Sequence, residues 1–126
     1  MAEAVIVDLL RIPFSRSRPA KPERDAYNKL RMDEAHAKVI TELISRNSVD
    51  AEEIGDIITG CSLQMRENFL MGGRTVVMLA GLPVSVPAQA IDRVCISGMS
   101  ALHQCAMEIM LGYSDICIAG GMEISE

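Results

Sequence analysis

The chain has 126 residues, of which 49% are hydrophobic and 23% charged, and its formal net charge is −5. This length and composition favour one folded domain and exclude a disordered chain. The acidic balance argues against a nucleic-acid partner, because phosphate binding needs clustered Lys and Arg. No apolar run reaches the length of a bilayer span, and the start MAEAVIVDLL lacks the basic segment of a secretory signal. We therefore expect no membrane association and a cytoplasmic location.

Hydrophobic periodicity predicts strands and helices that alternate along the chain. The predicted strands are at 4–8, 56–63, 86–91 and 116–119, and the predicted helices are at 33–46, 72–80 and 97–111. Residues 9–30 contain three prolines and are expected to form a long surface loop. Alternating strands and helices indicate the α/β class with a mainly parallel sheet. No linker divides the chain, so we expect residues 1–126 to form one domain.

The predicted helix at 97–111, SGMSALHQCAMEIML, is apolar on most of its sides. Only His103, Gln104 and Glu108 interrupt this pattern, whereas a surface helix of a single domain has a polar half. We therefore expect the helix to be buried between two layers. The chain is too short to supply both layers, so a partner or a second half of a longer protein is expected to cover it.

The cysteine pattern contains one position of particular interest. The chain has four cysteines: Cys61, Cys95, Cys105 and Cys117. They include neither a CxxC pair nor the Cys and His spacing of a zinc ribbon, so a metal protein has almost no support. We expect free thiols, most of them small core residues. Cys95 differs because it follows the strand at 86–91 and precedes the helix at 97–111.

The position of Cys95 is suitable for a nucleophile. The N-terminus of a helix presents unpaired N–H groups and the positive end of the helix dipole, which stabilise a thiolate. The same N–H groups can stabilise the oxyanion that forms when a carbonyl is attacked. Gly98 would allow close approach of a substrate or of another backbone. The alternative is a buried cysteine that happens to precede a helix, and position alone does not decide between the two.

The segment 92–122, DRVCISGMSALHQCAMEIMLGYSDICIAGGM, resembles the active-site signature of the thiolase family, which includes acetyl-CoA acetyltransferases and 3-ketoacyl-CoA thiolases. The residues that match this signature are Arg93, Cys95, Ser97, Gly98, Ala101, Gly112, Asp115, Ala119, Gly120, Gly121, Met122 and Glu123. Upstream, RIPF at 11–14 and AGLP at 80–83 also resemble family segments. The resemblance therefore covers essentially the whole chain.

The resemblance implies a thiolase-like N-terminal half, in a family whose two similar α/β halves enclose buried helices. It implies that Cys95 accepts the acyl group of an acyl-CoA as a thioester, and that a second acetyl-CoA attacks this thioester to give a 3-ketoacyl-CoA. Thiolysis is the reverse reaction. The resemblance further implies a homodimer or homotetramer whose third strand pairs across the dimer, with acyl-CoA as substrate and no cofactor.

Other family motifs have no counterpart in this chain. They are a glycine-rich histidine motif, an Asn-Glu motif, a second catalytic cysteine and the CoA-binding loop domain. We therefore expect residues 1–126 to be an incomplete thiolase N-terminal domain that is inactive alone. His103 lies two helical turns after Cys95, roughly 12 Å along a helix, which is too far for a base. His36 is expected to be a surface or capping residue.

Three points stay open at this stage. Asp92 stands where the family has Asn, and its carboxylate either disfavours a thiolate at Cys95 or, as we expect, hydrogen-bonds the nearby backbone of the turn. The chain could instead belong to another condensing enzyme such as a ketoacyl synthase, although the Ala-Gly-Gly-Met-Glu ending at 119–123 is unlike one. It could also be a non-enzymatic assembly subunit that keeps the fold and has lost the chemistry.

Overall fold

A computed structural model of the chain describes residues 2–16 and 18–124. In chain order its elements are helix α1 (Met32–Arg46), strand β1 (Ile54–Gly60), helix α2 (Arg74–Leu79), strand β2 (Ala88–Ile91), helix α3 (Ser97–Leu111) and strand β3 (Ile116–Gly121). Short 3-10 turns lie in the connections at Pro22–Arg24, Ala51–Glu53 and Arg66–Asn68. The alternation of strands and helices confirms the predicted α/β class.

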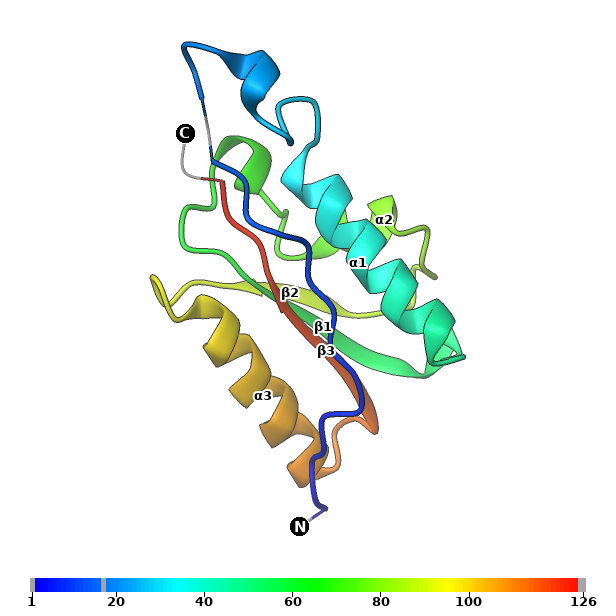
Figure 1. Cartoon of the computed structure of the whole chain (residues 1–126). Helices are drawn as coiled ribbons and strands as arrows, with labels where there is room; N and C mark the ends of the chain where they lie inside the picture. The colour runs from blue at the N-terminus through cyan, green and yellow to red at the C-terminus, as the bar shows by residue number, and fades with distance from the viewer. Residues whose placement is uncertain (1, 17, 125–126) are drawn as a thin grey trace.

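The described strands form one parallel sheet in the order β2-β1-β3. The central strand is β1, whose Ile57 pairs with Ala88 of β2 and with Ile118 of β3. Parallel strands need crossover connections, and α2 and α3 provide them. Figure 1 shows α1 and α2 on one face of the sheet and α3 on the other. The fold therefore has three layers around a sheet of parallel strands.

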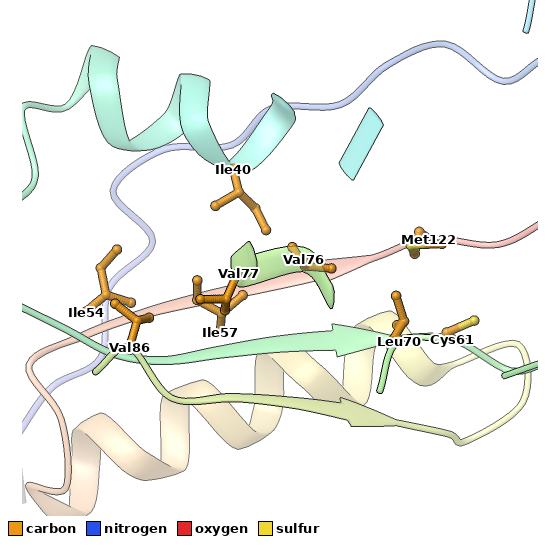
Figure 2. Close-up of a cluster of buried hydrophobic side chains, with 9 residues drawn as sticks. All are labelled: Ile40, Ile54, Ile57, Cys61, Leu70, Val76, Val77, Val86 and Met122. Carbon is orange, nitrogen blue, oxygen red and sulfur yellow. The ribbon is translucent and has the colours of Figure 1, made fainter. Parts of the chain in front are cut away.

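The larger core lies between the sheet and the two helices α1 and α2. Its buried members are Ile40, Ile54, Ile57, Cys61, Leu70, Val76, Val77, Val86 and Met122. In Figure 2, Ile40 extends from α1 towards Val76 and Val77 of α2, with Ile57 of β1 beneath them. Burial of one such aliphatic side chain stabilises the fold by roughly 1.5–3 kcal/mol. This layer is therefore the main source of hydrophobic stabilisation.

Helix α3 covers the opposite face of the sheet along one narrow stripe. Ala101 and Cys105, one helical turn apart, pack against Ile58 of β1. The outer side of the helix is open, with Met99 55% and Met107 54% exposed. Within the described residues the sheet therefore forms one of the two layers that were expected to enclose this helix. That a partner or a second half covers the outer side stays a prediction.

The segment Val94–Leu111, which contains α3, has the length and composition of a membrane span: 18 residues with a mean hydropathy of 1.3. The expectation that no apolar run reaches this length is therefore wrong. The finding is weak support for a membrane span, because core helices of water-soluble proteins pass the same test. Here the helix carries His103 and Glu108 and packs one stripe against the sheet.

The N-terminal segment is the main departure from the predicted strands. The predicted strand at 4–8 is extended chain outside the sheet, and Val5 and Val7 are 68% and 82% exposed. Strand β1 pairs with β2 on one side and with β3 on the other, and residues 4–8 take no part in these ladders. The segment is held instead by Asp8, whose carboxylate accepts from Asn47 at 2.7 Å and pairs with Arg46 at 3.0 Å.

The remaining elements follow the prediction, with shifts at their ends. The helix at 97–111 has the predicted bounds. Helix α2 begins two residues later than predicted because Gly72 and Gly73 have left-handed φ values of 61° and 91°. The loop at 9–30 is present and is ordered by polar contacts, since Asp25 accepts from the amide of Tyr27 and the Tyr27 hydroxyl donates to the carbonyl of Pro13.

Candidate active site

The carboxyl ends of the three parallel strands meet at one edge of the sheet, where α/β proteins bind ligands. Two backbone hydrogen bonds join the chain there: the Cys61 amide donates to the Ile91 carbonyl at 3.0 Å, and the Met122 amide donates to the Gly60 carbonyl at 3.1 Å. The turn that carries Cys95 follows β2 at this same edge. The predicted nucleophile thus lies at the edge where the topology favours a site.

The turn before Cys95 is fixed by two short side chains. The carboxylate of Asp92 accepts from the amide of Val94 at 2.8 Å. The hydroxyl of Ser97 accepts from the amide of Arg93 at 2.8 Å and donates to the carbonyl of Val94 at 2.6 Å. The expectation that Asp92 binds the nearby backbone is therefore confirmed. Its carboxylate and the Ser97 hydroxyl together define the path of the chain into α3.

Val94, the residue before the predicted nucleophile, has an unusual backbone conformation. Its φ is 53°, in the left-handed region that β-branched residues rarely adopt. Such a conformation costs on the order of 1–3 kcal/mol and persists only where surrounding contacts enforce it. The bonds from Asp92 and Ser97 supply that enforcement. Strain of this kind, stored beside an exposed thiol, is typical of sites where a side chain must be presented at a sharp turn.

Cys95 itself is exposed and lies two residues before the first residue of α3. In the part of the chain that the structure describes, the amides of Gly98 and Met99 donate to no backbone carbonyl. These are the unpaired N–H groups expected in the first turn of a helix. The space where a side chain of Gly98 would lie is open. The first turn of α3, which follows the exposed Cys95, thus presents N–H groups without backbone partners.

Gly60, at the end of β1, sets the position of the first turn of α3. A Cβ atom on Gly60 would lie 2.3 Å from the carbonyl carbon of Ser97 and 2.4 Å from the nitrogen of Gly98. Only glycine leaves room for this contact. From the sequence, Gly98 was expected to allow close approach of a substrate or of another backbone. In the structure the residue that must be glycine at this contact is Gly60, which packs against the backbone of Ser97 and Gly98.

The other cysteines differ from Cys95 in their surroundings. Cys61 and Cys105 are buried and Cys117 is half-buried, and all four thiols are free. Burial raises the pKa of each of the three, so little thiolate forms at them near neutral pH. The Cys117 thiol donates to the carboxylate of Glu108 at 3.6 Å. The reading of Cys95 as a buried core cysteine is therefore excluded, because it is the exposed one of the four.

His36 is a correction to the sequence analysis, which placed it on the surface or at a helix cap. It is buried, its ring nitrogen Nε2 lies 3.1 Å from the Thr59 hydroxyl, and Gly120 leaves the space that its ring occupies. The helical spacing of apolar residues could not reveal the burial of His36, because His36 packs on β1 and β3 through a polar contact with Thr59. His103 is exposed on α3. Neither histidine is brought to Cys95.

Substitution of His36 is expected to change how stability depends on pH. Burial lowers the pKa of His36 from 6.5 to about 4. Between these values the unfolded chain binds a proton at His36 and the folded chain does not. The stability that is complete above pH 6.5 is therefore lost as pH falls towards 4, by about 3 kcal/mol. Urea unfolding from pH 7 to 4 should show a shallower fall for His36→Gln, and an unchanged fall for the exposed control His103→Gln. Equal slopes for His36→Gln and the unsubstituted protein would contradict this account.

Two residues at this edge, Glu123 and Asn68, were not among the predicted site residues. The carboxylate of Glu123 accepts from the amide and the hydroxyl of Ser62, at 2.7 and 2.6 Å, and from the side-chain amide of Asn68 at 3.0 Å. Glu123 matches the Ala-Gly-Gly-Met-Glu segment of the signature, which was a signal for it. Asn68 lies in a stretch with no recognisable motif, so no feature of the sequence could have pointed to it.

Two further observations bound the chemistry. Among the described residues there is no group of three or more His, Cys, Asp or Glu that could hold a metal ion. A cavity of about 680 Å³ lies between α1, the loop at 10–15 and the end of β3, and no cysteine lines it. The candidate site therefore consists of the strand ends and the turn of Cys95.

Comparison with known proteins decides the family. Residues 4–125 match the model of the thiolase N-terminal domain. The chain belongs to the thiolase family. The match covers nearly the whole chain and confirms the resemblance that the Cys95 segment indicates.

Similar curated proteins carry the name 3-ketoacyl-CoA thiolase. The one from Saccharophagus degradans is 41% identical over 122 residues, which is 96% of this chain and 30% of the relative. Those from Pectobacterium carotovorum and Vibrio cholerae are 40% and 38% identical over 124 residues, which is 98% of this chain and 31% of each relative. This thiolase chain thus spans less than a third of the length of these relatives.

Proposed function

We propose that the protein transfers acyl groups between CoA thioesters, with Cys95 as the residue that carries the acyl group. The observation that supports this most is the placement of Cys95: exposed, at the start of α3, beside amides without carbonyl partners. Membership of the thiolase family and relatives named 3-ketoacyl-CoA thiolase support the same chemistry. The reaction runs as condensation to a 3-ketoacyl-CoA or as its thiolysis.

In the proposed first step, the Cys95 thiolate attacks the carbonyl carbon of an acyl-CoA. The carbonyl oxygen becomes an oxyanion, for which the amides of Gly98 and Met99 are candidate donors. The bond from the carbon to the CoA sulfur then breaks, and CoA leaves with a proton as the free thiol. Cys95 retains the acyl group as a thioester until an acetyl-CoA carbanion or a CoA thiolate attacks it and releases the product.

The proton transfers of this reaction need a base and an acid. Among the described residues, neither histidine is available, because His36 is buried against Thr59 and His103 lies eight residues beyond Cys95 on α3. We therefore propose that these groups come from outside residues 1–126. The alternative of a non-enzymatic subunit predicts that they are never supplied.

An acyl-exchange assay tests the proposed function. The intact protein, in which the base and acid from outside residues 1–126 are present, is incubated with acetyl-CoA and labelled CoA, and the label that enters acetyl-CoA is measured. We expect exchange in the unsubstituted protein and its loss, by at least roughly a thousandfold, in Cys95→Ala. The matched control is Cys117→Ala, which should keep exchange because Cys117 packs away from the turn. Exchange that survives in Cys95→Ala would contradict the proposal.

We also propose a homodimer or homotetramer in the cytoplasm. The outer edge of β2 has no neighbouring strand within the described residues, and the outer side of α3 is apolar and exposed. Both features favour assembly, and we propose α3 as a packing helix and not a membrane span. Four free thiols are typical of a reducing compartment. Light scattering should give a mass above that of the monomer, and a stable monomer would contradict this assembly.

A further inference from the structure

The carboxylate of Glu123 is the centre of a hydrogen-bond network at the carboxyl edge of the sheet. Its oxygens accept from the amide and hydroxyl of Ser62, from the amide of Leu63 at 3.3 Å and from the side-chain amide of Asn68. Although the residue is exposed as a whole, both oxygens are engaged by donors from the chain after β1. Hydrogen bonds to a charged acceptor are roughly twice as strong as neutral ones. Glu123 thus ties the end of β3 to the segment that follows β1.

Asn68 completes this network from the other side. It is 1% exposed, and its amide group bonds at both ends: the nitrogen donates to Glu123 and to the Ile124 carbonyl at 2.7 Å, and the oxygen accepts from the Ile124 amide at 3.0 Å. An amide that is buried with all these partners in place fixes a single geometry. Asn68 and Glu123, here called the edge clamp, therefore join the loops after β1 and β3.

The edge clamp connects to the turn of Cys95 through the end of β1. Ser62, which the clamp holds, follows Cys61, and the Cys61 amide donates to Ile91 at the end of β2. Gly60, one residue earlier, contacts the backbone of Ser97 and Gly98 without spare room. A shift of the end of β1 would therefore shift the first turn of α3, because closely packed backbone does not absorb such a movement.

We infer that Glu123 and Asn68 are positioning residues for Cys95: they hold the end of β1 in the place that sets the first turn of α3. This inference rests on the proposed function of Cys95. Neither residue touches the thiol. Their effect is on the direction of the helix amides and of the strained turn, on which stabilisation of a thiolate and of an oxyanion depends.

The test measures Cys95 alkylation by iodoacetamide in the folded protein, resolved by peptide mass spectrometry, as a function of pH. We expect Glu123→Gln to slow alkylation near neutral pH by roughly three- to tenfold because the first turn of α3 shifts, whereas loss of the negative charge alone would favour the thiolate and speed the reaction. Asn68→Asp places a carboxylate against the carboxylate of Glu123, and it should slow the alkylation of Cys95 more than Glu123→Gln does. When both substitutions are combined, the introduced amide can donate to the introduced carboxylate, so part of the rate should return. The control Glu53→Gln removes an exposed charge at the opposite end of β1 and should change nothing.

A purely structural role for the clamp makes a different prediction. Glu123→Gln would then lower the urea midpoint and leave the rate and pH profile of Cys95 in the folded protein unchanged, which would overturn the inference. Failure of the proposed function can be told apart from failure of this inference, because it is measured on the unsubstituted protein alone. If Cys95 of the unsubstituted protein reacts with the rate and pH profile that it has in urea, the proposed function fails and this inference fails with it.

Discussion

Replacement of Gly60 by alanine is expected to lower both the stability of the fold and the reactivity of Cys95. The new methyl group would lie 2.3 Å from the Ser97 carbonyl carbon, 2.6 Å from its oxygen and 2.4 Å from the Gly98 nitrogen. All three are backbone atoms, so no side-chain rotation relieves the overlap. Either the end of β1 or the first turn of α3 must move. We expect roughly 3 kcal/mol of lost stability and a tenfold or greater fall in Cys95 alkylation, by analogy with small displacements of reacting groups.

Gly98→Ala is the matched control for this prediction, since it adds the same methyl group on the other side of the same contact. No atom lies within 4 Å of the position that its Cβ would take. Alanine is also a better helix former than glycine by about 1 kcal/mol, so stability should rise. Urea unfolding of both variants checks the pair. Equal stability changes in Gly60→Ala and Gly98→Ala would contradict the contact between β1 and α3.

The second large effect is expected for Gly120→Ala. A Cβ atom there would lie 2.4 Å from Cε1 and 3.0 Å from Nε2 of the His36 ring. The imidazole is rigid and buried, and its movement would break the contact with the Thr59 hydroxyl. A buried polar group left without its partner costs about 1–3 kcal/mol, to which the overlap adds. We therefore expect Gly120→Ala to lose roughly 3 kcal/mol of stability.

A double-mutant cycle with His36→Ala tests the stated cause. His36→Ala removes the ring that the methyl group would meet, so Gly120→Ala should cost much less in that background. We expect the two losses to be non-additive by at least roughly 1 kcal/mol in urea unfolding. Additive losses would show that the damage from Gly120→Ala arises elsewhere, for example in the pairing of β1 with β3.

The sequence was sufficient for those parts of the fold that depend on local pattern. Helix α3 has the predicted bounds because Gly112 ends it in the left-handed conformation and Ser97 begins it. The strands β1, β2 and β3 fall within a few residues of their predictions, since short apolar runs indicate β1 and β3 and a loose alternation indicates β2. The turn of Asp92 was predicted from the habit of Asp in turns. The role of Cys95 rested on the resemblance to the thiolase signature as well as on its place between a strand and a helix, and this role stays a prediction.

The features that failed depend on which segments meet in space. Residues 4–8 have the composition of a buried strand, yet the sheet β2-β1-β3 forms without them. His36 gave no sign of burial, because its place under Gly120 and beside Thr59 arises from three separate elements. The Asn68 amide likewise acquires its partners from residues more than fifty positions away. Periodicity and motif spacing carry no information on such contacts.

The central claim is that Cys95 carries the acyl group, and one measurement tests it most directly. The intact protein, with the groups that lie outside residues 1–126, is mixed with acetyl-CoA, quenched in acid and digested, and the acetylated peptide is located by mass spectrometry. The account predicts an acetyl group on the peptide that contains Cys95, its removal when free CoA is added before quenching, and its absence in Cys95→Ala. The account would be contradicted by acetylation of Cys61, Cys105 or Cys117 to the same extent as Cys95, or by an acetyl group on Cys95 that free CoA does not remove.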